Sequence, residues 1–224
     1  QLLNLKCTDI NYHFHRHTIL TYACMNNYHK LVDNILKHED IDVNLYESLN
    51  GDTPLIISAK QNNTDIVKVL LKHPQTNINL QNFDQQTALT IATKNRHRQL
   101  VNLIIEDKRF DPNESKLNEA LKEAFANDMK EIVIDLIKCT SKEINTIRIN
   151  NQRILDIALT MNSREEVICE ILKNPNFDSK KSDILNAFIE AYSNVSDRCK
   201  SPIKIMKMLY DYDSEHDHLI DFKK

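Results

Sequence analysis

Apolar and polar positions alternate along the chain in a pattern that predicts pairs of short amphipathic helices. In the clearest pair, Leu55 and Ala59 lie four residues apart and therefore on one helical face. A second apolar stripe covers residues 66–71 after a polar turn. Thr53 is suited to cap the first helix, and Pro54 fits the first helical position, where no backbone hydrogen bond is lost. The pattern predicts a helix–turn–helix unit.

This unit returns in a fixed register. Thr18, Thr53 and Thr87 are spaced 35 and then 34 residues apart, and each is followed 26 residues later by an asparagine, namely Asn44, Asn79 and Asn113. A repeat of this length is typical of stacked helical units in which each contacts mainly its neighbours. The chain is therefore expected to be a helical repeat array.

Weaker copies of the unit extend in both directions. Apolar positions at 121–137 and 154–172 predict two further helix pairs, and residues 184–192 and 202–210 suggest a last one. Leu3 and the segment 9–11 resemble the end of a copy that lacks its first helix. We expect a partial repeat or cap at 1–12, a repeat array at 13–178, and a degenerate terminal repeat or cap with an acidic tail at 179–224.

The repeated residues resemble the ankyrin repeat. The second copy matches that family best, with Gly51-Asp52-Thr53-Pro54-Leu55, Ala59 and Ile66-Val67-Lys68-Val69-Leu70-Leu71. The glycine that links the two helices in the family is replaced by Asn27, Asn62 and Arg96. Asparagine tolerates the left-handed backbone that this turn needs, whereas arginine is harder to explain. The resemblance implies an all-α ankyrin-repeat solenoid of stacked helix-turn-helix units with short hairpin fingers.

Composition narrows the function. With Gly51 as the only glycine, the chain can spell neither a P-loop nor a dinucleotide-binding glycine motif. A net charge of -3 leaves no basic footprint for nucleic acid. No apolar run approaches the roughly 20 residues that span a bilayer. The first residues lack an initiator methionine and a secretory leader, so we expect an excerpt of a longer protein. Five cysteines at unpatterned spacings favour a reducing cytosol.

The repeat register also predicts which side chains form the core, and it suggests that the asparagine of each D-φ-N segment bonds the backbone locally, within its own finger. The predicted core residues are Leu20, Ala23, Val32, Leu36, Leu55, Leu71, Leu89, Ala92, Val101, Ile104, Ala124, Val133, Leu155, Ala158, Ile168 and Leu172.

The family resemblance further implies that a partner protein is bound by the finger tips and the exposed end of each first helix. Matched position by position, these sites are Phe14, His15, His17, Met25, Asn26, Leu49, Asn50, Asp52, Lys60, Gln61, Phe83, Asp84, Gln86, Lys94 and Asn95. Aromatic and methionine side chains at exposed positions are typical interface hot spots. Changes at Phe14, Met25, Lys60 and Phe83 are expected to abolish partner capture with little effect on melting.

Some histidines and cysteines suggest metal binding or nucleophilic chemistry, but simpler interpretations are favoured. His13, His15 and His17 would point to one side of an extended finger and could bind zinc, but an ordinary exposed finger is favoured; the same holds for His216 and His218 in the acidic tail. Cys24, Cys139 and Cys169 fit core positions better than a nucleophile. With no catalytic motif present, we expect no enzyme activity, no cofactor and no metal.

Asn44 carries a modification hypothesis. The spacing from Leu36 to Asp42-Val43-Asn44 resembles the segment in which cytosolic asparaginyl hydroxylases modify ankyrin repeats. A purely structural role is the favoured alternative.

The sequence thus predicts a non-catalytic protein-binding module, monomeric and cytoplasmic, which acts as an adaptor or as a microbial effector in a host cell. The alternative is the recognition arm of a larger enzyme whose catalytic domain lies outside this chain.

Overall fold

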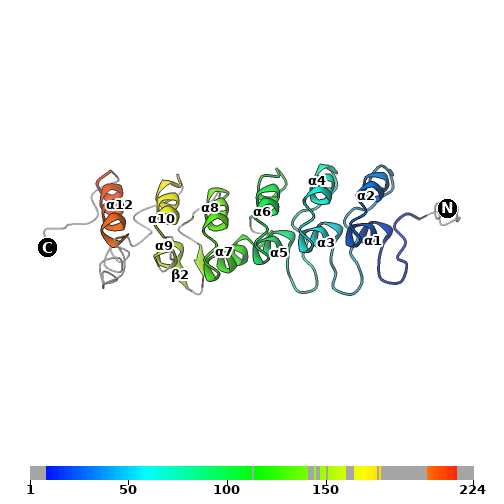
Figure 1. Ribbon diagram of the computed structural model, residues 1–224, viewed down its shortest axis with the longest axis horizontal. Helices are drawn as coiled ribbons and strands as arrows, with labels where there is room; N and C mark the ends of the chain where they lie inside the picture. The colour runs from blue at the N-terminus through cyan, green and yellow to red at the C-terminus, as the bar shows by residue number, and fades with distance from the viewer. Residues whose placement is uncertain are drawn as a thin grey trace. The chain divides into compact units, whose positions relative to one another are not determined.

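The computed structural model describes residues 9–112, 114–140, 144, 147–149, 151–159, 164–175, 177 and 201–215. It contains two compact units, Gln1–Ala120 and Leu121–Lys224, and the division falls within a helix. In each unit the helices come in pairs that stack side by side, as Figure 1 shows.

Unit 1 holds three helix pairs and the start of α7 (Leu117–Ala126). The pairs are α1 (Ile19–Met25) with α2 (His29–Ile35), α3 (Pro54–Lys60) with α4 (Thr64–Lys72), and α5 (Ala88–Lys94) with α6 (Arg98–Ile105). First helices pack on first helices, and second helices on second helices. Below, the repeats that begin at Thr18, Thr53 and Thr87 are called the first, second and third repeats, and the loop before each of these threonines is called the finger of that repeat.

Unit 2 contains the rest of α7, α8 (Lys130–Lys138), α9 (Ile154–Ala158), α10 (Arg164–Lys173) and α12 (Ser201–Glu215). A small antiparallel hairpin, β1 (Arg148–Ile149) and β2 (Gln152–Arg153), precedes α9, with Ile149 opposite Gln152. The expected helix pairs near 121–137 and 154–172 are confirmed, as is the helix at 202–210. Residues 184–192 lie outside the described part of the chain.

Threonine caps begin the first helices of all three repeats. The Oγ1 atoms of Thr18, Thr53 and Thr87 accept hydrogen bonds from the backbone N–H three residues later, at 3.1, 3.3 and 3.2 Å. Pro54 occupies the first turn of α3. These contacts satisfy backbone donors that have no partner inside the helix. The predicted helix starts are confirmed.

The turns between paired helices use the left-handed backbone that the family glycine would supply. The φ angles of Asn27, Asn62, Arg96 and Asp128 are 60°, 57°, 61° and 52°. Arg96 therefore adopts the same conformation despite its unfavourable side chain. The sequence places Asn162 at the corresponding turn of a later copy, and this residue lies outside the described part of the chain.

Burial confirms most of the predicted core. Thirteen of the predicted side chains are buried: Leu20, Ala23, Val32, Leu55, Leu89, Ala92, Val101, Ile104, Ala124, Val133, Leu155, Ala158 and Ile168. The prediction was wrong for Leu36, Leu71 and Leu172, which are half-buried. In each case the preceding residue, Ile35, Leu70 or Ile171, is the buried one. One residue corresponds to about 100° around a helix, so the second apolar side chain lies at the margin of the core.

Asparagines tie each finger base to the next. Asn44 Nδ2 donates to the backbone oxygen of Gln75 at 2.8 Å, and Asn44 Oδ1 accepts from the backbone N–H of Asn77 at 2.8 Å. Asn11 and Asn79 make the same pair of bonds, to residues 40 and 42 and to residues 109 and 111. The expectation that these amides bond within their own finger was therefore wrong, because each amide bonds backbone atoms of the following repeat. Asn113 lies outside the described residues.

Arg109 makes a second link between repeats. Its guanidinium donates to the backbone oxygens of Leu71, His73 and Thr76 at 2.5, 2.8 and 3.1 Å, and so caps the C-terminal end of α4. Asp107 Oδ2 accepts from the same guanidinium at 2.7 Å. Positive charge at a helix C-terminus is stabilising, and the last carbonyls of a helix, here that of Leu71, have no partner within it.

Candidate functional site

Three large apolar side chains are exposed at equivalent places in unit 1. Phe14, Leu49 and Phe83 each lie four residues before a threonine cap, at the tip of a finger. Their exposed fractions are 70%, 58% and 61%. We call these three residues the tip row. Single exposed apolar side chains are ordinary, but these three recur at the same position in successive repeats.

Backbone hydrogen bonds hold neighbouring fingers together. The N–H of Ser48 donates to the Arg16 oxygen, and the N–H of Phe83 donates to the Asn50 oxygen, both at 2.9 Å. One such bond joins the first finger to the second, and one joins the second to the third. The three residues of the tip row therefore lie on fingers whose backbones are hydrogen-bonded to one another.

Glu47 orders the second finger from inside. Its carboxylate is buried and accepts from the backbone N–H groups of Leu49 and Asn50 at 2.7 and 2.5 Å. Burial alone would raise the pKa of Glu47, but these hydrogen bonds, with a weaker one from Asp52 and the nearby His17, hold it below its ordinary value near 4.5. The finger therefore depends on an ionised carboxylate.

Gly51 allows the third finger to pack on the second. Its φ is +73°, and a Cβ atom placed there would lie 2.6 Å from Phe83 Cδ1. The Phe83 ring also meets Tyr46 edge-on, with ring centroids 5.6 Å apart. Phe83 is thus partly exposed and partly a structural contact between fingers.

A second row lies at the ends of the first helices, seven residues after each threonine cap. It consists of Met25, Lys60 and Lys94, all exposed, and we call it the helix-end row. The next residue in each repeat is an exposed amide, namely Asn26, Gln61 and Asn95. Gln61 Nε2 donates to the Met25 backbone oxygen at 2.7 Å and so links two of these positions.

Asp52 corrects the predicted surface. It was expected among the exposed binding positions, but only 4% of it is accessible. Its carboxylate accepts from Lys60 Nζ at 2.5 Å and from Asn82 Nδ2 at 2.8 Å. An unpaired carboxylate in this place would be costly. Asp52 therefore has a structural role, since its hydrogen bonds link the second finger to the third. The register located its backbone correctly but could not show these partners.

This network also changes the expected outcome of substitutions. Lys60 neutralises a buried carboxylate, and Phe83 covers Gly51. Their replacement will therefore disturb folding as well as the surface, contrary to the sequence-based expectation. Phe14 and Leu49 are cleaner probes, because each is more than half exposed and neither side chain takes part in the Asp52 ion pair or the Gly51 contact.

The other predicted positions are divided between surface and margin. His15, Asn50 and Asp84 are exposed, whereas His17 and Gln86 are half-buried. The extended finger that the zinc alternative requires does not form: the Phe14 N–H donates to the His17 oxygen and the His17 N–H to the Phe14 oxygen, with His15 left-handed at φ 58°. The backbone therefore turns at the segment in which that alternative needs His13, His15 and His17 to alternate.

Within the part of the chain that the structure describes, no three His, Cys, Asp or Glu side chains are arranged to hold a metal ion. Burial raises the pKa of Cys24 to about 12, although Ser58 opposes the shift, and burial raises that of Cys139 to about 12 as well. Nucleophilic attack by cysteine requires the thiolate, and neither of these thiols ionises near neutral pH. His216 and His218 lie outside the described residues.

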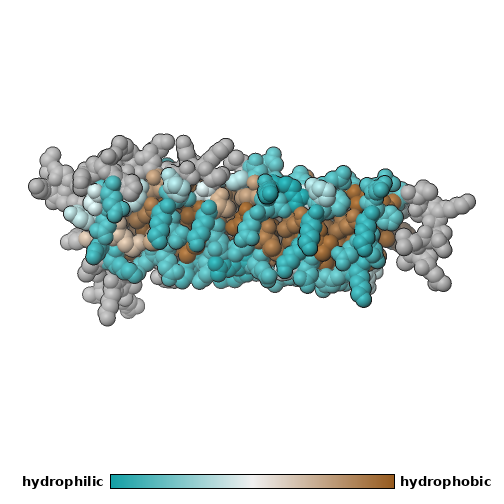
Figure 2. All heavy atoms as spheres, turned by 90° about the horizontal axis from the view of Figure 1, so that it is seen from above, coloured by the Kyte–Doolittle hydropathy of each residue, from teal (hydrophilic) through white to brown (hydrophobic). Residues whose placement is uncertain are grey.

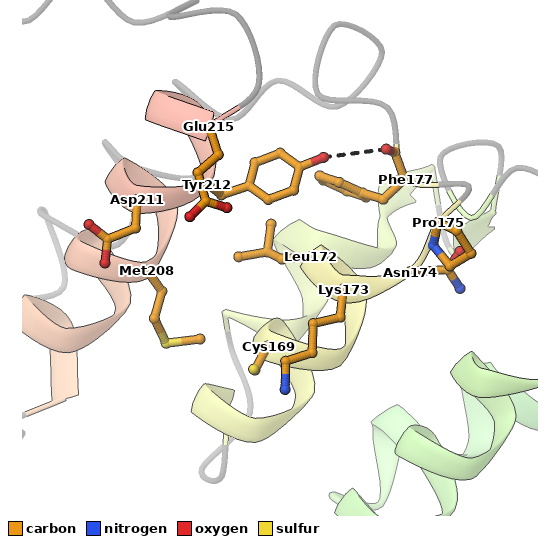
Figure 3. Close-up of a pocket in the computed structure, with 10 residues that line it drawn as sticks. All are labelled: Cys169, Leu172, Lys173, Asn174, Pro175, Phe177, Met208, Asp211, Tyr212 and Glu215. Carbon is orange, nitrogen blue, oxygen red and sulfur yellow. Dashed lines mark hydrogen bonds between the residues drawn. The ribbon is translucent and has the colours of Figure 1, made fainter.

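Unit 2 contains a cavity of about 540 Å³ between α10 and α12 (Figure 3). Leu172, Met208 and Tyr212 extend toward it, and the Tyr212 hydroxyl donates to the Phe177 oxygen at 3.3 Å. Asp211 and Glu215 also line it. This opening accounts for the incomplete burial of Leu172.

The face built by the second helices of unit 1 differs from the tip row. Figure 2 shows hydrophilic ridges with apolar atoms in the furrows between them. Large apolar side chains are absent from the exposed residues of α2, α4 and α6, all of which lie in described segments. The exposed apolar side chains of this unit gather instead at the fingers and around α1.

Comparison with known proteins identifies the repeats. A family model described as ankyrin repeats, three copies, matches residues 1–82 and 20–116, which together cover more than half of the chain. The chain belongs to the ankyrin repeat family. Ankyrin repeats are generally protein–protein interaction modules and are typically non-catalytic.

An I-kappa-B like protein, G2, of Microplitis demolitor bracovirus (isolate Webb) is 32% identical over 76 residues, which are 34% of this chain and 45% of that protein. The match thus spans less than half of the relative. Two crystal structures share the fold. The ankyrin repeat protein EF0377 has 22% identity and a TM-score of 0.60, covering 77% of this chain and 88% of that one. An ankyrin repeat domain from Acinetobacter baumannii AYE has 18% identity and a TM-score of 0.62, covering 86% and 96%.

Several residues that support this surface were not predicted from the sequence. Tyr46, Glu47 and Asn82 were not selected, yet they support Phe83, the second finger and Asp52. A signal for Glu47 existed, since an acidic residue shortly before a glycine turn can accept from the turn backbone. Tyr22 and Tyr28 are also exposed, with ring centroids 6.4 Å apart.

Across the described residues, no helix combines the length and apolar character needed to cross a bilayer.

Proposed function

We propose that unit 1 captures a partner protein on the surface formed by the tip row and the helix-end row. The tip row carries this proposal: the same finger position in three successive repeats bears an exposed Phe14, Leu49 or Phe83. The exposed part of these side chains gives no folding energy, whereas burying it against a partner is favourable by about 25 cal/mol per Å² of apolar surface. The amides beside the helix-end row supply polar contacts that make such an interface specific.

The role of this capture is that of an adaptor, or of an effector in the cytosol of a host cell. The viral origin of the I-kappa-B like relative supports the effector role. Binding alone, without catalysis, is sufficient for either role. The hydroxylation of Asn44 stays a prediction, and its amide already has two partners in the next finger.

The test compares partner capture by the purified chain and by Phe14→Glu/Leu49→Glu, from lysates of candidate host cells. Both positions are exposed, so circular dichroism melting should change little, while capture should fall at least tenfold. Lys68→Glu, on exposed α4 surface away from both rows, is the matched charge control. Undiminished capture by the double variant would refute the proposed surface.

A further inference from the structure

We propose that the outer side of the first repeat, formed by Tyr22, Tyr28 and Leu31, is a docking surface for one further ankyrin-type helix pair. We call these three residues the end face. The occupant is a repeat that continues the register of residues 9–11 on their N-terminal side. The inference goes beyond the proposed function, because the end face shares no residue with the tip row or the helix-end row.

The first argument is burial at equivalent positions of the first helices. Tyr22 lies four residues after its threonine cap and is 47% exposed, whereas Ile57 and Ile91 at the same position are 7% and 4% exposed. The first helix of the second repeat packs on that of the first, and the first helix of the third repeat packs on that of the second. The position is therefore buried in the two repeats that have a preceding first helix beside them.

The second helices show the same difference. Leu31 is half-buried, whereas Ile66 and Leu100 at the same position are 1% and 0% exposed. Here too, α4 packs on α2 and α6 packs on α4. The end face thus includes both helices of the first repeat, as a stacking surface does. Its three side chains carry no charge, so covering them desolvates no ionised group.

Polar contacts show the direction in which these positions point. His97 lies at the position of Tyr28, and its Nδ1 atom is 3.1 Å from the backbone oxygen of Ala59, in the preceding repeat. The Gln61 amide likewise donates to the Met25 oxygen of the repeat before its own. Side chains of this part of the repeat therefore reach back toward the preceding one.

The segment before the first repeat indicates what would cover the end face. Asn11 Nδ2 donates to the Asp40 oxygen, and Asn11 Oδ1 accepts from the Asp42 N–H, both at 2.8 Å. Asn44 and Asn79 make the same pair of bonds, and each of them follows a complete helix pair. The backbone at Asn11 thus already has the place that the end of a stacked repeat occupies. An occupant in this register is another helix pair.

The experiment extends the full chain by a copy of residues 53–68 placed directly before Gln1. The threonine that begins the extension then precedes Asn11 by 26 residues, as Thr53 precedes Asn79. A control extension has two additional serines before Gln1, which turn the added second helix by about 200° and break the register. Hydrogen exchange with mass spectrometry measures each helix separately.

We expect the extension in register to slow amide exchange in α1 and α2 at least tenfold, with α10 and α12 unchanged, because a repeat stabilises mainly its neighbours. The control extension should have little effect. Tyr22→Glu/Tyr28→Glu should change exchange little in the chain without an extension, since both side chains are about half exposed. In the extended chain it should remove the protection, because stacking would bury two carboxylates.

Three results would overturn the inference. Two of them are equal slowing by both extensions and no slowing by either. The third is a dimer of the chain without an extension, seen in analytical ultracentrifugation and abolished by Tyr22→Glu/Tyr28→Glu, because a second copy would then cover the end face. None of these results bears on the proposed function, which is tested separately by partner capture with Phe14→Glu/Leu49→Glu.

Discussion

Gly51 shows how much of this surface depends on one backbone position. It combines a left-handed φ with direct contact to the Phe83 ring, and these two requirements have different physical causes. A Cβ atom opposes the left-handed backbone by about 1–2 kcal/mol, and the steric conflict with Phe83 adds to this. The single glycine of the sequence therefore lies where the second and third fingers meet.

We predict that Gly51→Ala destabilises unit 1 by at least about 1–2 kcal/mol, measured by urea unfolding. The double variant Gly51→Ala/Phe83→Ala separates the two causes. Without the ring only backbone strain remains, so the two substitutions should be less than additive. Strict additivity would show that Phe83 does not restrict this position.

Glu47 leads to a prediction about acid stability. Its pKa in the folded chain lies below its ordinary value near 4.5, so the ionised form stabilises the fold. This contribution is fully present above about pH 4.5 and is lost as the pH falls through the lowered folded value. The pKa of Asp107 is also lowered, because Arg109 donates a hydrogen bond to its carboxylate.

We expect the urea midpoint of unit 1 to fall between pH 5 and pH 3 in the native chain. Glu47→Gln should lower the midpoint at pH 7 and flatten its dependence on pH, because the variant has no carboxylate to protonate at this position. An unchanged pH slope in Glu47→Gln would contradict the role assigned to this carboxylate.

At the residue scale, the sequence predicted groups whose partners are close in the chain. Thr18, Thr53 and Thr87 cap helices three residues away, and the repeat register reveals them. Asp52 could not be interpreted correctly, because its partner Asn82 lies 30 residues away. A polar residue at a variable surface position gives no sign that the next finger will cover it.

The elements themselves followed from periodicity. Alternating apolar stripes located the helix pairs, but the pattern could not decide which of two adjacent leucines is buried. Leu70 is fully buried, whereas Leu71 is half-buried and lies at the edge of the same helix. The Arg109 cap on α4 was also beyond prediction, since it joins groups up to 38 residues apart.

This adjacent pair provides a matched test. Leu70→Ala should cost about 2–5 kcal/mol, because it removes a fully buried side chain and leaves a cavity. Leu71→Ala should cost clearly less, since part of its side chain is already in water and the site can relax. Urea unfolding of both variants measures the difference. Equal losses would mean that the boundary of the core is misplaced.

The whole molecule combines local contacts, and this explains both its tolerance of sequence drift and the limits of prediction. Every bridge described above joins neighbouring repeats: the asparagine amides, the Arg109 cap and the finger backbone bonds. In such an array, stability is approximately a sum over repeats and their interfaces. The register could therefore predict the array, while the identity of a partner depends on side chains that vary between repeats.

Local coupling also predicts how the chain responds to damage in one unit. Ile171 is fully buried in α10, within unit 2, so Ile171→Ala should cost about 2–5 kcal/mol there. Because contacts are made mainly between neighbours, amide exchange should accelerate in α8, α9, α10 and α12 and remain unchanged in α1 through α4. Hydrogen exchange with mass spectrometry resolves these segments in the full chain. Partner capture should persist in this variant, since the tip row belongs to unit 1; acceleration throughout the chain would instead show that all repeats unfold together.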